Sequence, residues 1–598
     1  MTDLAVSLGP GLLRDVHQWG LLSWGDVHVA QKVAYLYGES DQSVQLALAL
    51  ATRSLREGST CLELDRMAEA RFEPLDGTAG EVPDHWWPQP QAWREAIAAS
   101  PLVNVGIEPP GDRPLRLSGQ RLYLERYWQE ESTVADELTA RRSVSGSAPE
   151  MDALAAVASE ILTADDPDQA AAAVVPLYTG VSVIAGGPGT GKTYTLARML
   201  GMLSRLSATP AVIALAAPTG KAAARMDESM ARALAGMPAD LQQQLGSLHA
   251  TTIHRLLGWV PDSRNRFRHH RFNPLPHDVV VIDEASMVSV TLMARLLEAM
   301  RPQARLVLVG DPNQLAPVEA GAVLADIAEA PTQELPQLRQ ALDRLALDAA
   351  ARPVAVLRRN HRSGAVLANL AAAVLAGDAD TAIGLAEAGH PEISLAASAS
   401  ESGLRERAVT NGVAMIEAAA AGDVAAALAE LERHRLLCAH RSGPFGVSHW
   451  SRQVEDWIGA VLPGFDASGP WYAGRPVLIS QNTPELGLFN GDTGVVVNDG
   501  GQLRVYFARG SQVQAVSPFV LDATQTIHAM TVHKAQGSQF DDVSLILPAP
   551  DSPLLTRELL YTAVTRAARR VELIGSADSL RQAIRQRARR ASGLLARL

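Results

Sequence analysis

The sequence predicts an α/β protein in which two lobes are each built on a parallel sheet flanked by helices. Short apolar runs alternate with amphipathic helical stretches from about residue 150 onwards, and this alternation is typical of parallel sheets. A glycine-rich loop directly follows the first apolar run, Val181–Ala185, as a phosphate-binding loop should. The other runs that we expect to be buried strands are Ala211–Ala217, Asp278–Ile282, Leu306–Val309 and Leu436–Ala439.

The composition is that of an ordinary globular protein with several domains. The 598 residues carry a net charge of −12, so a nucleic acid would have to bind in a local basic channel. The two cysteines, Cys61 and Cys438, are too few for a disulfide framework or a tetrahedral metal site. No apolar run is long enough to span a bilayer and no secretory leader is visible, so we expect a soluble, cytoplasmic protein with no membrane contact.

Changes in pattern along the chain predict five segments. Short β runs broken by turn residues such as Asn490-Gly491-Asp492 predict a small antiparallel barrel that interrupts the second lobe. The predicted segments are an accessory domain at 1–145, a first lobe at 150–335 with a hairpin insertion at about 259–277, the first part of a second lobe at 350–465, the inserted barrel at 470–522, and the rest of the second lobe at 523–598.

The accessory domain is rich in tryptophan but carries no recognisable catalytic cluster. These side chains form either an ordinary core or a surface for partners, since aromatic residues are favoured at interface hot spots. Alternating apolar residues in 121–127 predict a strand. The tryptophans are Trp19, Trp24, Trp86, Trp87, Trp93 and Trp128.

The glycine-rich loop at 186–193 matches the phosphate-binding loop in full. Its backbone N–H groups would wrap the phosphates at a helix N-terminus. Lys192 would reach the β- and γ-phosphates of ATP, and Thr193 would bind Mg²⁺. The residues that we expect to hold the nucleotide here are Gly186, Gly187, Pro188, Gly189, Thr190, Gly191, Lys192, Thr193 and Tyr194.

Two further strands end in polar residues that suit ATP hydrolysis. Asp283 and Glu284 follow a buried apolar run, where carboxylates are costly unless they serve a purpose such as metal binding. We expect Asp283 to hold Mg²⁺ and Glu284 to orient or deprotonate the attacking water. Gln314 follows the next strand, where its neutral amide would sense the γ-phosphate; a simple turn residue is the alternative.

Basic residues give a second, weaker indication of phosphate chemistry. Only four of the 53 are lysine, and three of these, Lys192, Lys221 and Lys534, lie inside motifs. A compact ammonium is not interchangeable with a guanidinium as a phosphate ligand. The arginines near the end of the chain form either a DNA contact or the solvated end of a helical tail; they are Arg581, Arg585, Arg587, Arg589 and Arg590.

The motifs, taken in order, resemble those of superfamily-one helicases. They are most similar to the RecD family, the helicase subunit of the bacterial RecBCD (exodeoxyribonuclease V) complex. The resemblance covers residues 165–598 and includes the accessory domain only loosely, through 121–124. It rests on Ala217–Arg225, Thr252–Gly258, Asp283–Ser286, Gly310–Gly321, Asn360–Ser363, Gly443–Val447, Gly487–Asp492, Thr531–Ser538 and Tyr561–Ala567.

The resemblance implies two RecA-like P-loop NTPase lobes with an SH3-like barrel inserted in the second. It also implies roles for residues outside the phosphate-binding loop. Gln169 would read adenine, and Gln539 stands where the family has a glutamate that contacts the nucleotide sugar, which puts ribose recognition in doubt. Arg362 and Arg566, from the second lobe, would stabilise γ-phosphate charge when the lobes close, as an arginine finger does.

DNA contacts are also implied by the resemblance. Hydroxyls, imidazoles and loop amides suit contact with a nucleic-acid backbone regardless of sequence. The family's contact positions correspond to Pro218, Thr219, Thr252, His254, Thr531 and His533. A basic stretch falls where the family has a strand-separating hairpin, although it also fits a charged exposed loop; it comprises Arg264, Arg266, Arg268, His269, His270 and Arg271.

The expected function is therefore that of an ATP- and Mg²⁺-dependent 5′→3′ DNA helicase. By resemblance it would track the 5′ strand of an unwinding duplex beside RecB-like and RecC-like subunits, in double-strand-break repair by recombination and in DNA degradation. We find no nuclease site in the sequence. A free-standing 5′→3′ helicase is one alternative, and a DNA clamp or regulatory subunit that does not translocate is another. The hydrolysis residues argue against the clamp, which needs none.

Overall fold

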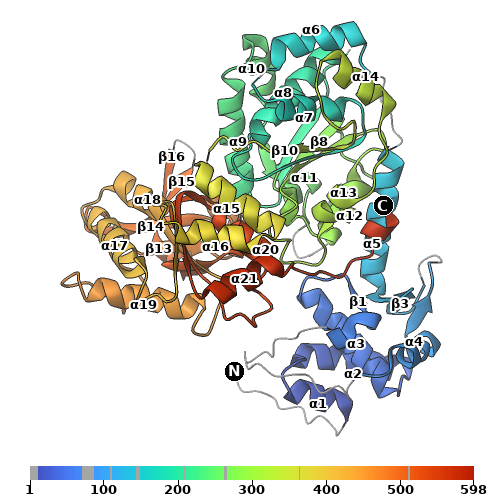
Figure 1. The fold of residues 1–598 in the computed structure, drawn as a ribbon, viewed down its shortest axis with the longest axis horizontal. Helices are drawn as coiled ribbons and strands as arrows, with labels where there is room; N and C mark the ends of the chain where they lie inside the picture. Colours follow the sequence, from blue (N-terminus) through green and yellow to red (C-terminus); the bar gives the residue numbers. More distant parts are fainter. Residues whose placement is uncertain are drawn as a thin grey trace.

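The computed structural model describes residues 11–69, 87–107, 111–142, 148–163, 165–207, 209–260, 266–362, 364–509 and 512–598. Four sheets organise these residues, and two of them are entirely parallel. In Figure 1 the first lobe lies above the N-terminal domain, and the second lobe lies to their left, with α15 and α20 on the side that faces the first lobe. The predicted α/β class with two parallel-sheet lobes is confirmed.

The first lobe is a six-stranded parallel sheet in the order β10-β5-β9-β8-β6-β7. Its central strands are buried along their length because helices cover both faces, so they read as unbroken apolar runs. The strands are β5 (Val181–Gly186), β6 (Ile213–Ala217), β7 (Ala250–Thr252), β8 (Val279–Ile282), β9 (Arg305–Gly310) and β10 (Val354–Leu357). The helices are α6 (Met151–Ile161), α7 (Pro167–Val174), α8 (Lys192–Leu206), α9 (Gly220–Leu234), α10 (Ala239–Leu245), α11 (Ile253–Leu257), α12 (Val290–Ala299), α13 (Val323–Glu329) and α14 (Pro336–Arg344).

Strand β10 departs from the predicted division of the chain. It pairs in parallel with β5 and so lies in the first lobe's sheet, although the sequence predicted the second lobe from residue 350. Its last pair, Leu357 with Gly186, places it directly beside the start of the phosphate-binding loop. The chain therefore enters the second lobe from the edge of the nucleotide site.

The second lobe is a five-stranded parallel sheet in the order β11-β20-β19-β12-β18. Its strands are β11 (Ile393–Ala396), β12 (His434–Cys438), β18 (Ala529–Thr531), β19 (Phe540–Ile546) and β20 (Ala567–Ile574). Its helices are α15 (Ala365–Ala376), α16 (Ala379–Glu387), α17 (Leu404–Ala420), α18 (Val424–Arg433), α19 (Val447–Gly459), α20 (Arg557–Val564) and α21 (Ala577–Arg585), with a short 3₁₀ turn η7 (His533–Ala535) after β18.

The insertion in the second lobe is an antiparallel sheet in the order β16-β15-β14-β13-β17. Its strands are β13 (Pro476–Ile479), β14 (Thr493–Asp499), β15 (Gln502–Arg509), β16 (Gln512–Val516) and β17 (Thr524–Thr526). The strand order and antiparallel pairing fit the predicted small β insertion, and its likeness to an SH3 barrel stays a prediction.

Four helices of the N-terminal domain pack around a mixed sheet in the order β1-β4-β3-β2, and a fifth, longer helix follows the sheet. The predicted strand at 121–127 is wrong in its second half, because β4 ends at Leu124 and α5 begins at Glu125. The elements are α1 (Leu12–Gln18), α2 (Trp24–Tyr37), α3 (Gln42–Arg56), β1 (Cys61–Glu63), α4 (Pro90–Ala99), β2 (Val103–Val105), β3 (Leu115–Ser118), β4 (Arg121–Leu124) and α5 (Glu125–Arg142).

The last residues leave the second lobe and return to the rest of the molecule. The predicted helical tail with five arginines is wrong, because α21 ends at Arg585. Beyond it, Arg590 donates to the backbone oxygen of Glu319 at 3.2 Å, and Oγ of Ser592 lies 2.9 Å from a carboxylate oxygen of Asp326 and 3.1 Å from one of Glu131. Figure 1 shows this red segment lying against α5. Polar contacts with distant segments, and not helical periodicity, decide its course.

None of the helices in the described ranges combines the length and apolar character that crossing a membrane requires. Within the same ranges, no group of three or more histidine, cysteine or acidic side chains is arranged to hold a metal.

Candidate functional site

The phosphate-binding loop connects the end of β5 to the start of α8. Gly189 and Gly191 have φ angles of +83° and +81°, a region that side chains other than glycine rarely adopt. A Cβ on Gly191 would lie 2.3 Å from Nε2 of Gln169, so the loop needs glycine there. Lys192 Nζ donates to the backbone oxygens of Gly186 at 2.8 Å and Gly187 at 3.0 Å. These are bonds that phosphate oxygens can replace.

An acidic pair follows β8 on the same edge of the sheet. Burial and the neighbouring Glu284 raise the pKa of Asp283 to about 6, while Lys192 opposes the shift. Oδ1 of Asp283 accepts the backbone N–H of Glu284 at 2.8 Å. Glu284 itself has φ 49° and ψ 39°, and backbone strain of this kind clusters at functional sites. A buried acid beside a lysine suits a divalent cation and a phosphate.

A third carboxylate, Asp311, follows β9 at the interface between the two lobes, which we call the cleft. It is 1 % exposed, and burial raises its pKa. Tyr561 of the second lobe donates its hydroxyl to Oδ2 at 3.0 Å, and Gln314 donates Nε2 to the same atom at 3.1 Å. Asp311 thus orients Gln314, and neither Asp311 nor Tyr561 was among the predicted site residues.

The second lobe contributes arginines to this cleft. Arg566 is 3 % exposed and donates Nε to the backbone of Thr562 and Nη1 to that of Ser538, both at 3.1 Å. Burial lowers its pKa, whereas the nearby Glu284 favours its charged form. Arg362 is exposed at the mouth and donates to Oε1 of Gln539. The two arginines predicted as fingers therefore lie at different depths.

A hollow of about 30 Å³ opens between the phosphate-binding loop and the second lobe. Pro188 and Asn360 line it together with Arg362 and Gln539, so three of the residues predicted to contact the nucleotide share one cavity. Asn360 also donates Nδ2 to the backbone of Pro188 at 3.1 Å. Contacts of this kind bring the second lobe onto the phosphate-binding loop.

Gln169 lies buried beneath the same loop. Its Nε2 donates to the backbone of Thr190 at 3.1 Å and is 3.2 Å from Nε2 of His361. His361 in turn lies 2.8 Å from Oδ2 of Asp166, so the glutamine is held by both lobes. These contacts place Gln169 beside the loop, and its role in reading adenine stays a prediction.

The predicted DNA contacts of the first lobe lie at two helix starts. Thr219, which follows Pro218, caps α9 by accepting the N–H of Ala222 at 3.2 Å. Thr252 caps α11 by accepting the N–H of Arg255 at the same distance. Burial lowers the pKa of His254 in that helix, which favours its neutral form.

Those of the second lobe are more enclosed. Thr531 is 7 % exposed and accepts the N–H of Lys534 at 3.3 Å. Burial, aided by Arg590 and Arg441, lowers the pKa of His533 to about 4. This imidazole is therefore neutral at physiological pH.

The basic stretch before β8 forms a small excursion from the first lobe. Isolated bridges join Trp259 to Phe267 and His270 to Asn273, and Phe272 is exposed beside the second bridge. Arg264 lies outside the described residues. Both bridges are antiparallel, and a hairpin that separates strands stays a prediction.

Comparison with known proteins decides the family. The RecBCD enzyme subunit RecD of Mycolicibacterium smegmatis is 47% identical over 97% of this chain and 98% of its own length. That of Mycobacterium tuberculosis is 46% identical over all of this chain and 98% of its own length. The chain belongs to the RecD family.

Other matches agree with this membership. The family model described as the RecD N-terminal domain matches residues 18–123, where sequence motifs gave only a loose resemblance. An AAA domain model matches residues 169–320, and a UvrD-like helicase C-terminal domain model matches residues 526–574. The ATP-dependent RecD2 DNA helicase of Deinococcus radiodurans is 32% identical over 70% of this chain and 50% of its own length.

The cleft of this RecD-family chain contains groups that the sequence prediction missed. Asp311 could have been found by the reasoning that found Asp283, because it also follows a buried strand directly. Tyr561 and Arg225 lie in motifs that carry the family resemblance, but no local pattern indicated that packing of the lobes would bring Tyr561 to Asp311 and Arg225 to Gly537.

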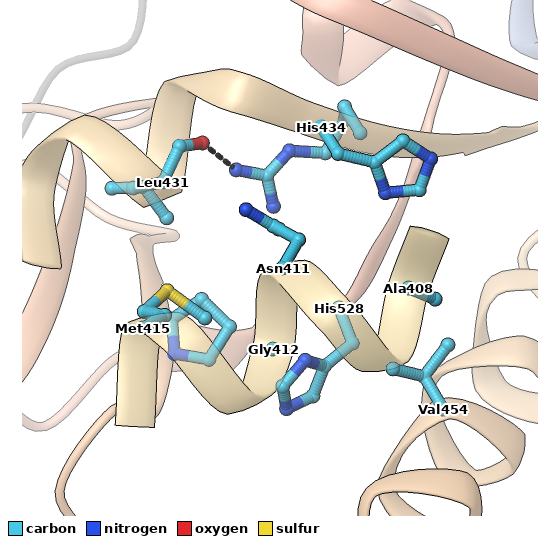
Figure 2. Close-up of a pocket in the computed structure, with 10 residues that line it drawn as sticks. Ala408, Asn411, Gly412, Met415, Leu431, His434, Val454 and His528 are labelled. Carbon is cyan, nitrogen blue, oxygen red and sulfur yellow. Dashed lines mark hydrogen bonds between the residues drawn. The ribbon is translucent and has the colours of Figure 1, made fainter. Parts of the chain in front are cut away.

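A second hollow lies in the second lobe beside β12 (Figure 2). His434 and His528 lie on its wall, and burial lowers the pKa of each to about 3, so both imidazoles are neutral. The hollow has room for about 20 Å³, enough for a single water molecule. None of the residues that we predict to contact the nucleotide lines it, so we assign no nucleotide to it.

Proposed function

We propose that this chain is an ATP-dependent DNA helicase that translocates 5′→3′ on single-stranded DNA as a subunit beside RecB-like and RecC-like partners. Family membership supports this assignment, and the cleft provides chemistry for it. We place its work in the cytoplasm, in repair of double-strand breaks and in DNA degradation.

The observation that carries the proposal is a cleft bridged by both lobes. Tyr561 reaches Asp311 across it, and Gln536 Nε2 donates to the backbone of Leu315 at 2.7 Å. Leu315 N–H donates in turn to the hydroxyl of Thr562 at 2.9 Å. Because these contacts join the lobes at the predicted nucleotide site, binding or hydrolysis of ATP there would alter the relative orientation of the lobes. A motor requires this coupling.

In this cleft each side would do a separate task. Lys192 and the loop amides would bind the phosphates, Glu284 would orient or deprotonate the attacking water, and Arg566 and Arg362 would stabilise charge on the γ-phosphate. Thr193 and Asp283 would hold Mg²⁺, whose chemistry is to offset phosphate charge. The raised pKa of Asp283 fits this, because a cation compensates a buried carboxylate.

A Lys192→Gln variant tests the proposal, with Lys32→Gln as control. Lys32 is an exposed lysine of α2, outside the motifs. We expect ATP turnover and strand separation by Lys192→Gln to fall roughly 10²-fold or more, while its binding to DNA and to partner subunits is retained. Unwinding unchanged by Lys192→Gln would refute the motor. DNA binding by the unaltered protein without ATP turnover or movement, measured on labelled duplexes, would favour the clamp.

A further inference from the structure

A three-residue turn, Gly537–Gln539, is held by three guanidinium groups. Arg225 Nη1 donates to the backbone oxygen of Gly537, and Arg566 Nη1 donates to that of Ser538 at 3.1 Å. Arg362 Nη1 donates to the side chain of Gln539. Arg225 comes from α9 of the first lobe, whereas the other two come from the second lobe. The turn is therefore a point where both lobes act on the same backbone.

Arg225 also borders the predicted hydrolysis residues. The charged groups that face it are Glu432, Glu284, Glu228 and Arg362. Arg566 faces the same Glu284 from the opposite lobe. Two guanidinium groups, one from each lobe, thus lie near one carboxylate that is predicted to act on the attacking water.

The bond from Arg225 to Gly537 joins two segments that each begin at a predicted DNA contact. On the first lobe, α9 starts at its cap Thr219, six residues and roughly 9 Å of helix before Arg225. On the second lobe, Lys534 N–H bonds to Thr531, and Ser538 N–H bonds to the backbone of Ala535 at 2.9 Å. A continuous set of contacts therefore runs through the cleft from Thr219, a predicted DNA contact of the first lobe, to Thr531, a predicted DNA contact of the second.

We propose that Arg225 is a positioning residue that couples DNA binding to ATP turnover. This inference rests on the proposed function. DNA held by Thr219 and Thr531 fixes α9 relative to the second lobe. Arg225 then holds Gly537, so that the adjacent Ser538 keeps Arg566 aimed at the site that Glu284 serves. Without Arg225 the cleft still closes on ATP, but bound DNA no longer sets its geometry.

A merely structural role for Arg225 predicts something different. Other contacts already join the lobes, among them those from Gln536 to Leu315 and from Tyr561 to Asp311. Loss of a simple tie would lower thermal stability and would reduce turnover equally with and without DNA. Only the coupling role predicts that turnover falls more with DNA than without it.

The test compares Arg225→Gln and Arg225→Lys with Arg205→Gln in the full chain. Arg205 lies on α8, away from the cleft, and pairs with Glu160 at 2.8 Å and with Asp240 at 2.5 Å. ATP turnover is measured without DNA and across a titration with oligothymidylate, and thermal melting is recorded for each protein.

We expect Arg225→Gln to lower DNA-stimulated turnover roughly 10- to 100-fold, the effect of losing one charge-assisted hydrogen bond. DNA-free turnover should fall less than about 3-fold, and the oligonucleotide concentration at half-maximal stimulation should not move. Arg225→Lys should fall between Arg225→Gln and the unaltered protein, and Arg205→Gln should match the unaltered protein.

Two results would overturn the inference while leaving the helicase in place. One is an equal fall in both rates, and the other is full DNA stimulation in Arg225→Gln. If the unaltered protein shows ATP turnover that DNA does not stimulate, the proposed function fails and this inference fails with it.

Discussion

Two halves of one sheet edge in the first lobe differ in the polar groups that they carry. Strands β5, β8 and β9 end at the phosphate-binding loop, Asp283 and Asp311, whereas β6 and β7 end at Thr219 and Thr252. The sheet order places β5, β9 and β8 side by side, with β6 and β7 beyond them. Strand order therefore separates a charged half from a hydroxyl half.

The difference follows from what each half has to recognise. The charged half needs partners from the second lobe, because a buried carboxylate is costly without them. The hydroxyl half needs no partner from the second lobe for its hydrogen bonds, since each threonine caps its own helix. Changes in the charged half should therefore alter turnover, and changes in the hydroxyl half should alter stability and DNA affinity.

The largest effect is expected from Arg362→Lys. A lysine cannot offer two parallel donors to a phosphate, so turnover should fall about 10³-fold. ATP affinity and melting temperature should change little, because the side chain is exposed and contacts Gln539. Steady-state ATPase assays check this. Arg358→Lys, whose side chain pairs with Asp168 at 3.2 Å, is the control. A similar loss of turnover in both variants would contradict a specific role for Arg362 beside the charged half of the sheet edge.

Lys221→Met tests whether a positive charge on Lys221, in the hydroxyl half, destabilises the fold. Burial, aided by Arg225, lowers the pKa of Lys221 to about 7, so the unfolded chain binds the proton more tightly. As pH rises from 7 to 10, the free energy of unfolding should therefore rise by up to ~1.4 kcal/mol per pH unit relative to Lys221→Met.

The advantage of Lys221→Met should accordingly be greatest at pH 7 and below, and should shrink towards pH 10. Denaturant melts at several pH values measure it, with the exposed Lys32→Met as control. A difference that does not change with pH would show that Lys221 keeps its charge.

Thr252→Ala should cost about 1 kcal/mol of stability, because it removes the helix cap. DNA affinity should fall as well, with little change in DNA-free turnover. Thr252→Ser keeps the hydroxyl and should restore both quantities. Urea unfolding and oligonucleotide binding are the measurements. If serine fails to restore either quantity, the cap is not what the threonine contributes.

The smallest effect is expected from Gln539→Glu. A carboxylate there would form an ion pair with Arg362 at the mouth of the cleft, worth roughly 0.2–1 kcal/mol. Turnover should fall by up to about 5-fold at low salt and recover at high salt, because salt screens the pair. Initial rates at two salt concentrations check this. A loss that salt does not reverse would point to ribose recognition instead.

The sequence alone predicted the parts of the fold that depend on local pattern. The strands at 181–186 and 279–282 were recognisable because each is a short apolar run with polar residues at its end. Lys192 and Asp283 could be placed at one edge of the sheet because parallel strands end together. The structure brings these two close enough for Lys192 to oppose the raised pKa of Asp283.

Features that depend on packing between distant segments were not predictable in this way. Strand β10 joins the first sheet although it follows the predicted boundary, because it pairs with β5. The hydroxyl of Tyr561 reaches Asp311 only because α20 packs at the lobe interface. No pattern within either segment contains that information.

The returning tail changes how the second lobe can travel. Residues 365–585 are fixed at one end by β10 and at the other by the segment in which Ser592 and Gly593 bond to the buried Glu131. A lobe that is attached at two separate points can rotate about the line that joins them, but it cannot separate from the rest of the molecule. We therefore expect ATP-driven motion of the second lobe to be mainly a rotation about this line, and a wider movement would first have to break the contacts of the tail with Glu131.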